Sequence, residues 1–430
     1  MKLKYPWWVS TLAVLGAIAL TGALITLFSS VGRRPQVLHP TSVPPVESPD
    51  FLLSVAGAAG VPIWAGGTVQ QLDNGVEFFP ALLEAIRGAR QTINFAVYIW
   101  EAGQASDQVF AALIERARAG VQVRVLLDGM GGVKAPDEQV AALQAAGGQV
   151  QRFRPPRFGK LARFHKRNHR RSIVVDGTVA FTGGAAVGDK WVGNADSEEH
   201  WRDTMTRFTG PPAAGIQAAF VTVWAPTAGE LLSGTAFFPP LPAVPDTSLR
   251  TIAVSSFPSS DDHPLRLFLL QTFLSARRTL YIATPYFVPD ETLRRAVIDR
   301  ARGGVDVRIL LPDEHTDAKM IRRTSHKYYA ELMAAGVRIY EYQPTMMHSK
   351  TVVVDGLWTV VGSANMDIRS HELNQENVVG VLDAAFAARV QAAFQRDLSV
   401  SSEIDRERWA RRGLGDRFME RVSSLFAEQY

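Results

Sequence analysis

The most pronounced apolar stretch of the chain lies near its N-terminus. From Trp7 to Phe28 there are 22 consecutive residues without a charge, and two tryptophans stand at the start of this run. At about 1.5 Å per residue, a helix of this length spans the roughly 30 Å hydrocarbon core of a bilayer. A cleaved secretory signal has a shorter apolar core of about 7–15 residues, so the pattern predicts an uncleaved membrane anchor over residues 1–34.

Basic residues flank this run on both sides, with Lys2 and Lys4 before it and Arg33 and Arg34 after it. The positive-inside rule needs an asymmetry of basic charge, so the orientation of the anchor stays open. Residues 35–50 are rich in proline and show no hydrophobic period, which indicates a stiff spacer. No later stretch is long and apolar enough to cross a bilayer, and the remainder is expected to be globular.

Beyond the spacer, the pattern of apolar and polar positions occurs twice. In each copy a buried strand is followed by the end of a helix, a glycine, a strand of alternating apolar residues, and a pair of strands joined by Asp-Gly. Three segments of the first copy match three of the second: 89–100 with 276–287, 113–127 with 297–311, and 171–184 with 350–363. Such self-similarity indicates one structural unit used twice.

Helices that alternate with buried, β-branched strands are typical of a layered α/β fold with a largely parallel sheet. We therefore expect a pseudo-dimer of two homologous α/β units, the first over residues 51–235 and the second over residues 236–430, with a site at their internal interface. The second unit ends in apolar residues at helical spacing within 414–426. This predicts an amphipathic C-terminal helix that packs on the core or lies on a membrane.

The amino-acid composition limits the kinds of active site and of binding partner that the chain can have. The 430 residues include no cysteine, which excludes disulfides, thiolate metal sites, iron–sulfur clusters and thiol nucleophiles. A hydrophobic content of 47% is enough for sizeable cores and excludes disorder along the whole chain. The formal net charge of +4 suits an anionic partner such as phospholipid or nucleic acid, without choosing between them.

The second copy contains residues suited to phosphodiester chemistry. His348 and Lys350 are two positions apart in a strand pattern, so their side chains leave the same face. A neutral imidazole attacks phosphorus near neutral pH, and a fixed cation stabilises charge on the phosphoryl oxygens. Asp355 lies in an Asp-Gly turn at an odd offset from His348, which favours a structural or indirect role. Beyond the returning strand, Gly362 and Ser363 leave room for a phosphate near backbone donors.

The first copy repeats this arrangement in the same register. His169, Arg171 and Asp176 take the places of the histidine, the cation and the turn aspartate. Gly183 and Gly184 take the places of the two small residues. With only nine histidines in the chain, two at equivalent positions of the repeat point to a shared function. We therefore expect them to face each other as nucleophile and general acid.

Basic residues crowd the approach to the first motif histidine. They are Arg154, Arg157, Lys160, Arg163, Lys166, Arg167, Arg170 and Arg171. Such a run either collects anionic lipid headgroups, at about 1 kcal/mol per basic residue near a membrane surface, or forms a solvated loop. Both interpretations stay open from the sequence.

These motifs resemble the signature of a known family. The pattern His-x-Lys-x4-Asp followed by Gly-Ser-x-Asn, at 348–355 and 362–365, is that of the phospholipase D superfamily, and two copies per chain are typical of its membrane-lipid branch. Further stretches are similar to bacterial cardiolipin synthases: 284–293, 304–317, 336–350 and 362–377, together with 181–189 and 201–204 in the first half. The resemblance extends over about residues 75–425.

The resemblance implies a phosphatidyltransferase that uses no metal and no other cofactor. One histidine attacks phosphatidylglycerol, forming a phosphatidyl-histidine and releasing glycerol, and the other protonates that leaving group and then activates a second phosphatidylglycerol. The family pattern assigns His169 as nucleophile and His348 as acid, and it places Asp203 and Glu376 behind the histidines to fix their tautomers. Asn365 belongs to the same motif. The resemblance also implies a bacterial inner-membrane location, with phosphatidylglycerol and the membrane as partners.

Two positions depart from the family pattern, because Arg171 stands where the family has lysine and Ala186 where it usually has asparagine. Arginine keeps the charge and can grip phosphate with two donors, whereas alanine removes an amide. Three alternatives remain: a phospholipase D that uses water, a membrane-tethered nuclease of the same superfamily, and a lipid-binding scaffold with a decayed first motif. Only the last of these rests on the two departures. Stacking aromatics interleaved with basic residues are not evident, which argues against nucleic acid as the partner.

Overall fold

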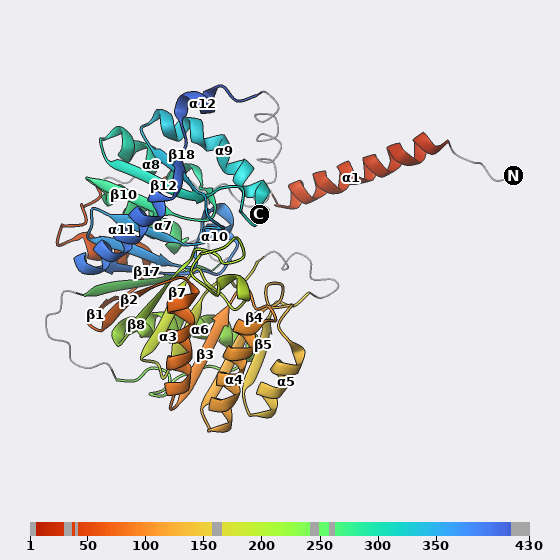
Figure 1. The fold of residues 1–430 in the computed structure, drawn as a ribbon, viewed down its shortest axis with the longest axis vertical. Helices are drawn as coiled ribbons and strands as arrows, with labels where there is room; N and C mark the ends of the chain where they lie inside the picture. The colour runs from red at the N-terminus through yellow and green to blue at the C-terminus, as the bar shows by residue number, and fades with distance from the viewer. Residues whose placement is uncertain are drawn as a thin grey trace. The chain divides into compact units, whose positions relative to one another are not determined.

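The computed structural model describes residues 6–29, 37–38, 42–156, 166–240, 249–257 and 263–413. The chain divides into two units, Met1–Thr41 and Ser42–Tyr430. The described part of the first unit contains helix α1 (Trp7–Ser29), drawn in red in Figure 1. Across the described ranges, no helix has both the length and the apolar composition that crossing a bilayer requires. The anchor over residues 1–34 stays a prediction, and the expected helix at 414–426 lies outside the described residues.

The second unit contains both copies of the repeat, as the sequence predicts. The elements of the first half are β2 (Thr68–Asp73), α3 (Asn74–Gly88), β3 (Thr92–Val97), α4 (Gln104–Arg118), β4 (Gln122–Asp128), α5 (Asp137–Ala145), β5 (Gln149–Phe153), β6 (Ser172–Val175), β7 (Val179–Gly183), the 3-10 helix η2 (Asp189–Trp191), β8 (Thr204–Thr209) and α6 (Pro211–Ala228).

The second half begins with two elements from early in the chain, α2 (Phe51–Ala59) and β1 (Ile63–Ala65). Its other elements are β9 (Arg250–Ser255), α7 (Pro264–Ser275), β10 (Thr279–Ala283), β11 (Phe287–Val288), α8 (Glu291–Arg302), β12 (Asp306–Pro312), α9 (Lys319–Ala334), β13 (Arg338–Tyr342), β14 (Thr351–Val354), β15 (Trp358–Gly362), β16 (Met366–Asp367), α10 (Ile368–Glu372), β17 (Asn377–Leu382), α11 (Ala384–Ser399), β18 (Ser401–Glu403) and α12 (Arg406–Ala410).

The two main sheets share one strand order. The first runs β2-β8-β7-β6-β3-β4-β5, and the central seven strands of the second run β9-β17-β15-β14-β10-β12-β13. Within each set, two strand pairs are parallel, β3 with β4 and β4 with β5 in the first half. The pairs formed by β6, β7, β8 and β2 are antiparallel. The α/β repeat is thus confirmed, whereas the prediction of a largely parallel sheet is wrong, because the hairpin extends each sheet with antiparallel strands.

The first α/β half also starts later than residue 51, where the sequence predicts its start. Strand β1 pairs with β9 of the second sheet, with Ile63 opposite Ile252. The ring of Phe51 in α2 meets Trp358 of β15 edge-on, with 5.1 Å between ring centroids. Residues 51–65 therefore complete the second half, although the sequence pattern groups them with the first.

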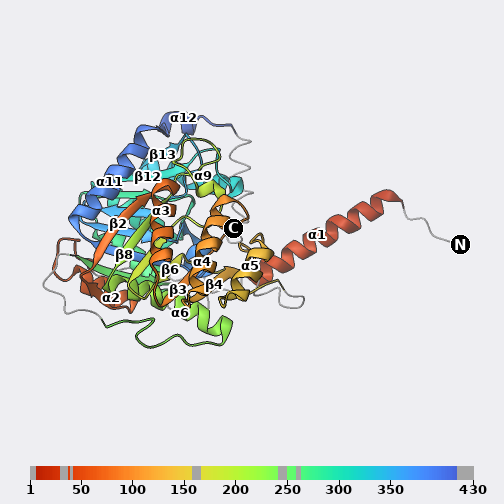
Figure 2. The ribbon, with the colours of Figure 1, turned by 60° about the horizontal axis from the view of Figure 1, so that its bottom comes forward.

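The two halves pack against each other through an apolar cluster. Val174 and Phe208 of the first sheet lie in the same buried cluster as Val353 and Val361 of the second, together with side chains of α6 and α11. In Figures 1 and 2, helices α9, α11 and α12 of the second half lie above α4, α5 and β4 of the first half. The interface between the halves is thus a buried core within one unit.

The aspartates of the two Asp-Gly turns organise the end of each sheet that lies away from the motif histidines. Asp176 and Asp355 adopt left-handed φ angles of 51° and 52°. The carboxylate of Asp355 accepts three backbone N–H groups at 2.7–2.8 Å, from Arg277, Arg278 and Thr279. The carboxylate of Asp176 accepts three at 2.8–2.9 Å, from Arg90, Gln91 and Thr92. The structure therefore does not bring these two motif residues to the reacting centre.

We predict that Asp355→Ala lowers the free energy of unfolding by about 2–4 kcal/mol, because three N–H groups lose a charged acceptor. Urea denaturation followed by circular dichroism measures the change. The matched control is Asp299→Ala on the exposed face of α8, for which a change within about 0.5 kcal/mol is expected. Equal stability of the two variants would contradict the structural role of the turn aspartate.

Candidate active site

The two motif histidines lie where the halves meet. The backbone N–H of His169 donates to the carbonyl oxygen of Gln375 in the second half, at 2.9 Å. Reciprocally, the N–H of His348 donates to the carbonyl oxygen of Arg202 in the first half, at 2.7 Å. Isolated parallel bridges next to these bonds join Asn168 to Gln375 and Arg202 to Met347. Each histidine is thus held in place by a loop of the opposite half.

Each histidine also takes its carboxylate from the opposite half. His348 Nδ1 lies 2.7 Å from Asp203 Oδ2. His169 Nδ1 lies 2.9 Å from Glu376 Oε1 and 3.0 Å from Oε2. A carboxylate on Nδ1 favours the tautomer with a proton on Nδ1 and leaves Nε2 for substrate. The structure therefore brings Asp203 and Glu376 to the histidines, and it pairs them crosswise between the halves.

Burial sets the charge of the histidines. The pKa of His348 falls to about 4, because burial and the charge of Lys350 outweigh the pull of Asp203. The pKa of His169 lies well below its ordinary value, again through burial first and then through Arg171 and Lys350. Both imidazoles are therefore neutral near pH 7, the form that a nucleophile needs.

The two carboxylates differ in their electrostatics. Burial raises the pKa of Glu376 to about 7, against the opposing hydrogen bond of Ser363 and the charge of Arg171. Burial also acts to raise the pKa of Asp203, but the charge and hydrogen bond of His348, with help from Lys350, lower it overall. Asp203 is therefore ionised at neutral pH, whereas Glu376 titrates there.

Two basic side chains stand beside the histidines in equivalent places. Lys350 Nζ donates to the carbonyl oxygen of His348 at 2.8 Å and lies 3.2 Å from its Nε2. Arg171 Nη1 donates to the carbonyl oxygen of His169 at 2.7 Å, and its Nε reaches the carbonyl oxygen of Ala185 at 3.4 Å. Arg171 is fully buried, and its Nη2 has no hydrogen-bond partner among the described residues. This nitrogen is free to bind an anionic oxygen.

The small residues after each returning strand have a different role from the one the sequence suggests. The N–H of Gly184 donates to the carbonyl oxygen of Thr204 at 3.1 Å, and that of Ser363 to Asn377 at 2.9 Å, so neither is a free donor for phosphate. A Cβ on Gly183 would lie 2.4 Å from the carbonyl oxygen of Thr204, and one on Gly362 would lie 2.4 Å from that of Asn377. These glycines allow close approach of the strands that carry the carboxylates. Asn365 is buried, and its side-chain oxygen has no partner within the described part of the chain.

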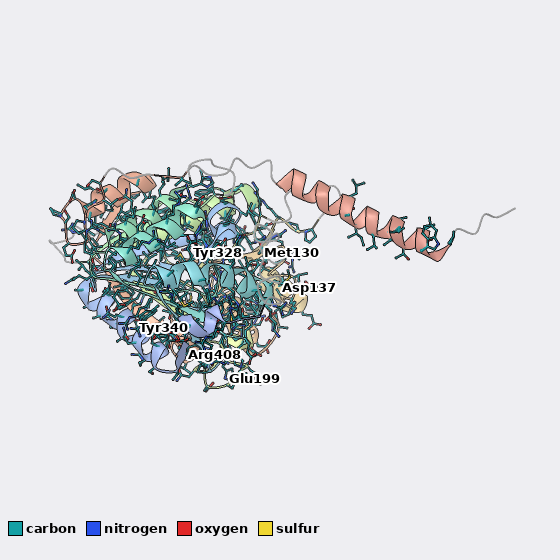
Figure 3. The ribbon with its side chains drawn as sticks, turned by 90° about the horizontal axis from the view of Figure 1, so that it is seen from above. Met130, Asp137, Glu199, Tyr328, Tyr340 and Arg408 are labelled. Carbon is teal, nitrogen blue, oxygen red and sulfur yellow. The ribbon has the colours of Figure 1, made fainter. Side chains whose placement is uncertain are left out.

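Aromatic residues surround the two histidines, and none of them is among the site residues that the sequence predicts. The ring centroid of Tyr98 lies 4.9 Å from that of His169. Those of Trp191 and Trp201 lie 5.8 and 5.3 Å from that of His348. The position of Tyr98 directly after β3 is a usable signal, because ligands bind at the carboxyl ends of parallel strands. The tryptophans bracket a loop at 192–200, whose Glu199 projects at the edge of the unit in Figure 3.

The basic run before the first motif is partly buried. Arg170 is 1% exposed, and its guanidinium donates to the carbonyl oxygens of Ala219, Ser256 and Glu376. Arg167 is also buried, with Nη1 3.6 Å from Asp128 Oδ1. These two arginines are therefore not placed to collect lipid headgroups. Residues 157–165 of the run lie outside the described residues.

Comparisons with known proteins agree with this geometry. The family model described as "Cardiolipin synthase, PLD-like domain" matches residues 82–198 and 269–398. Cardiolipin synthase A of Pseudomonas fluorescens (strain SBW25) is 36% identical over 352 residues, which are 81% of this chain and 72% of that protein. A cardiolipin synthase of Geobacillus sp. (strain WCH70) is 34% identical over 378 residues, 87% of this chain and 75% of that protein. The chain belongs to the PLD-like domain family of cardiolipin synthases.

Solved structures support the same fold. The phosphatidylserine synthase of Haemophilus influenzae Rd KW20 matches with a TM-score of 0.68 at 16% identity, over 87% of this chain and 96% of that one. A polyphosphate kinase from Porphyromonas gingivalis matches with a TM-score of 0.54 at 10% identity, over 86% of this chain and 53% of that one. At such identities the likeness concerns the fold alone.

We predict that Arg171→Lys keeps the rate of phosphodiester turnover within about tenfold of wild type, because an ammonium can bind the carbonyl oxygen of His169 as Lys350 binds that of His348. Arg171→Met, which removes the cation, should lower the rate by about 100-fold or more. Initial rates under substrate saturation measure both. A folded but inactive lysine variant would show that the second guanidinium donor is itself required.

Proposed function

We propose that the protein is a phosphatidyltransferase of the cardiolipin synthase type, which joins two phosphatidylglycerol molecules and releases glycerol. The observation that carries this proposal is the pair of crossed histidine–carboxylate contacts, His169 with Glu376 and His348 with Asp203. The names of the relatives support the lipid substrate, since both are cardiolipin synthases.

In the first step, Nε2 of His169 attacks the phosphorus of phosphatidylglycerol and the bond to the glycerol oxygen breaks. His348 gives its proton to that oxygen, so that glycerol leaves and a phosphatidyl-histidine remains. An incoming phosphodiester anion raises the pKa of His348 above its resting value of about 4, because an opposite charge favours the protonated imidazole. The substrate thus helps to charge its own general acid.

In the second step, the now neutral His348 takes the proton of a hydroxyl on a second phosphatidylglycerol. That oxygen attacks the phosphorus, the bond to Nε2 of His169 breaks, and cardiolipin is formed. Arg171 Nη2 and Lys350 Nζ are positioned to offset the negative charge on the phosphoryl oxygens in both steps. Asp203 and Glu376 hold the two imidazoles by their Nδ1 atoms throughout.

We also propose that residues 7–28 anchor the enzyme in a bacterial inner membrane. The support is the uncharged sequence of this segment, which forms most of helix α1. Two of the apolar side chains on α1, Leu15 and Ile18, are 56% and 62% exposed, as expected of side chains that would face lipid.

The proposed reaction is tested with purified full-length protein in detergent and phosphatidylglycerol as the lipid substrate, with products resolved by mass spectrometry. We expect cardiolipin and glycerol in equal amounts, and no product from His348→Ala or His169→Ala. Phosphatidic acid as the main product would replace the transferase with a hydrolase. Degradation of single-stranded DNA without lipid turnover would point to a nuclease, and wild-type rates in both histidine variants would overturn the mechanism.

The anchor is tested by charge insertion. Leu15→Arg together with Ile18→Arg should cost about 5–7 kcal/mol of insertion, because each arginine near the centre of a spanning helix costs about 2.5–3.5 kcal/mol. The double variant should then be extracted from membranes by alkaline carbonate, whereas wild type stays with them. The control is Lys319→Glu together with Arg323→Glu, at two exposed positions of α9. It changes the charge of the protein outside the proposed anchor. Retention of the arginine variant in the pellet would contradict the anchor.

A further inference from the structure

Each carboxylate behind a histidine accepts a further side-chain hydrogen bond, and the two donors come from different parts of the chain. Glu376 Oε2 accepts the hydroxyl of Ser363 at 2.5 Å. At the equivalent position of the first half stands Gly184, which has no side chain to donate. Serine does not fit there, because a Cβ on Gly184 would lie 2.1 Å from Asp203 Oδ1. The shorter carboxylate of Asp203 occupies the space that a hydroxyl would need.

Trp191 supplies the missing donor from another element. Its indole Nε1–H donates to Asp203 Oδ2 at 2.9 Å, the same oxygen that lies 2.7 Å from His348 Nδ1. The other oxygen of Asp203 accepts the backbone N–H of Thr204 at 2.7 Å. Trp191 is 1% exposed, so this hydrogen bond is shielded from water. With these three donors, the carboxylate is fixed in position and its ionised form is favoured.

The indole is itself held on several sides. Trp201 meets it edge-on, with ring centroids 5.1 Å apart. Lys190 Nζ lies 4.9 Å from the ring centroid of Trp191 and 4.7 Å from that of Trp201, and it pairs with Glu101 at 3.1 Å. Cation–π contacts of this kind are worth about 0.5–1 kcal/mol at exposed sites and more when desolvated. Lys190 therefore stabilises the positions of both tryptophans beside His348.

We propose that Trp191 is a positioning residue for the acid–base histidine: through Asp203 it keeps His348 oriented and able to carry the proton in each step. Ser363 has the corresponding part for Glu376 and the nucleophile. The proposal rests on the proposed phosphatidyl transfer, in which one histidine attacks phosphorus and the other carries the proton. It predicts that the loss of one indole N–H impairs the acid step and leaves the attack on phosphorus intact.

The test replaces Trp191 by benzothienylalanine, which keeps the bicyclic shape and exchanges the N–H for sulfur. With phosphatidylglycerol, we expect kcat to fall roughly 10- to 100-fold with little change in KM, the range for losing a hydrogen bond to a charged group. The acidic limb of the pH profile should move to higher pH, because a carboxylate that loses a donor has a raised pKa. Trp191→Phe is the genetically encoded version of the same change.

The decisive comparison uses a leaving group that needs no proton. With the 4-nitrophenyl ester of phosphatidic acid, single-turnover release of 4-nitrophenolate should change less than about threefold in the isostere, since a good leaving group does not depend on general acid catalysis. Ser363→Ala, on the side of the nucleophile, should slow both substrates alike. Trp201→Phe is the matched aromatic control, because within the described residues Trp201 contacts the ring of His348 without a hydrogen bond to Asp203.

Two outcomes overturn the proposal. One is an isostere with the wild-type kcat and pH profile on phosphatidylglycerol, and the other is equal slowing of both substrates, which would mark a general structural defect. In an Asp203→Asn background, Trp191→Phe should add less than about a twofold effect, because the residue acts through Asp203. If wild type converts phosphatidylglycerol to phosphatidic acid and forms no cardiolipin, the proposed function fails, while the role of Trp191 is still measured by the release of glycerol, whose oxygen needs the proton from His348.

Discussion

Neither half of the molecule contains a complete histidine–carboxylate pair, because each histidine takes its carboxylate from the other half. The rest of the structure depends on this pairing across the interface. Glu376 is fully buried and Asp203 is 2% exposed, so either carboxylate would be costly to bury without its histidine. Docking of the halves supplies the partner to both at once. Assembly of the site and formation of the interface between the halves are therefore one event.

The backbone and the buried arginines follow from the same exchange. Arg202, next to Asp203, accepts the N–H of His348 through its carbonyl oxygen, while its guanidinium pairs with Asp397 at 3.0 Å and Asp73 at 3.2 Å. Arg170, next to His169, donates to carbonyl oxygens of both halves, among them those of Ala219 and Glu376. Each cation compensates buried acceptors where the chain crosses the interface, which explains why Arg170, although basic, is buried beside the first motif.

The sequence predicts what is encoded locally. The repeat, the hairpins and the shared face of His348 and Lys350 follow from periodicity and from the Asp-Gly turns, and all appear in the structure. The crosswise pairing of the carboxylates does not follow, because it depends on how two distant segments dock. The same holds for residues 51–65, whose strand adds to the second sheet, and for the antiparallel strands. The role of Trp191 cannot be predicted from the sequence for a further reason. Only the fold shows that Asp203 has no donor from Gly184 and that the indole N–H of Trp191 donates to it instead.

The two halves share one fold, but the carboxylates behind their histidines differ in pKa. This difference fits the separate roles proposed for the two histidines. The nucleophile becomes positively charged only while it holds the phosphatidyl group. Glu376, with a pKa of about 7, can ionise fully when that charge forms beside it, and it need not carry an uncompensated buried charge before then. The acid–base histidine exchanges a proton in both steps and needs an anion at all times. Asp203, whose pKa is lowered, provides one, and this supports the proposed assignment of the acid–base role to His348 and of the nucleophilic role to His169.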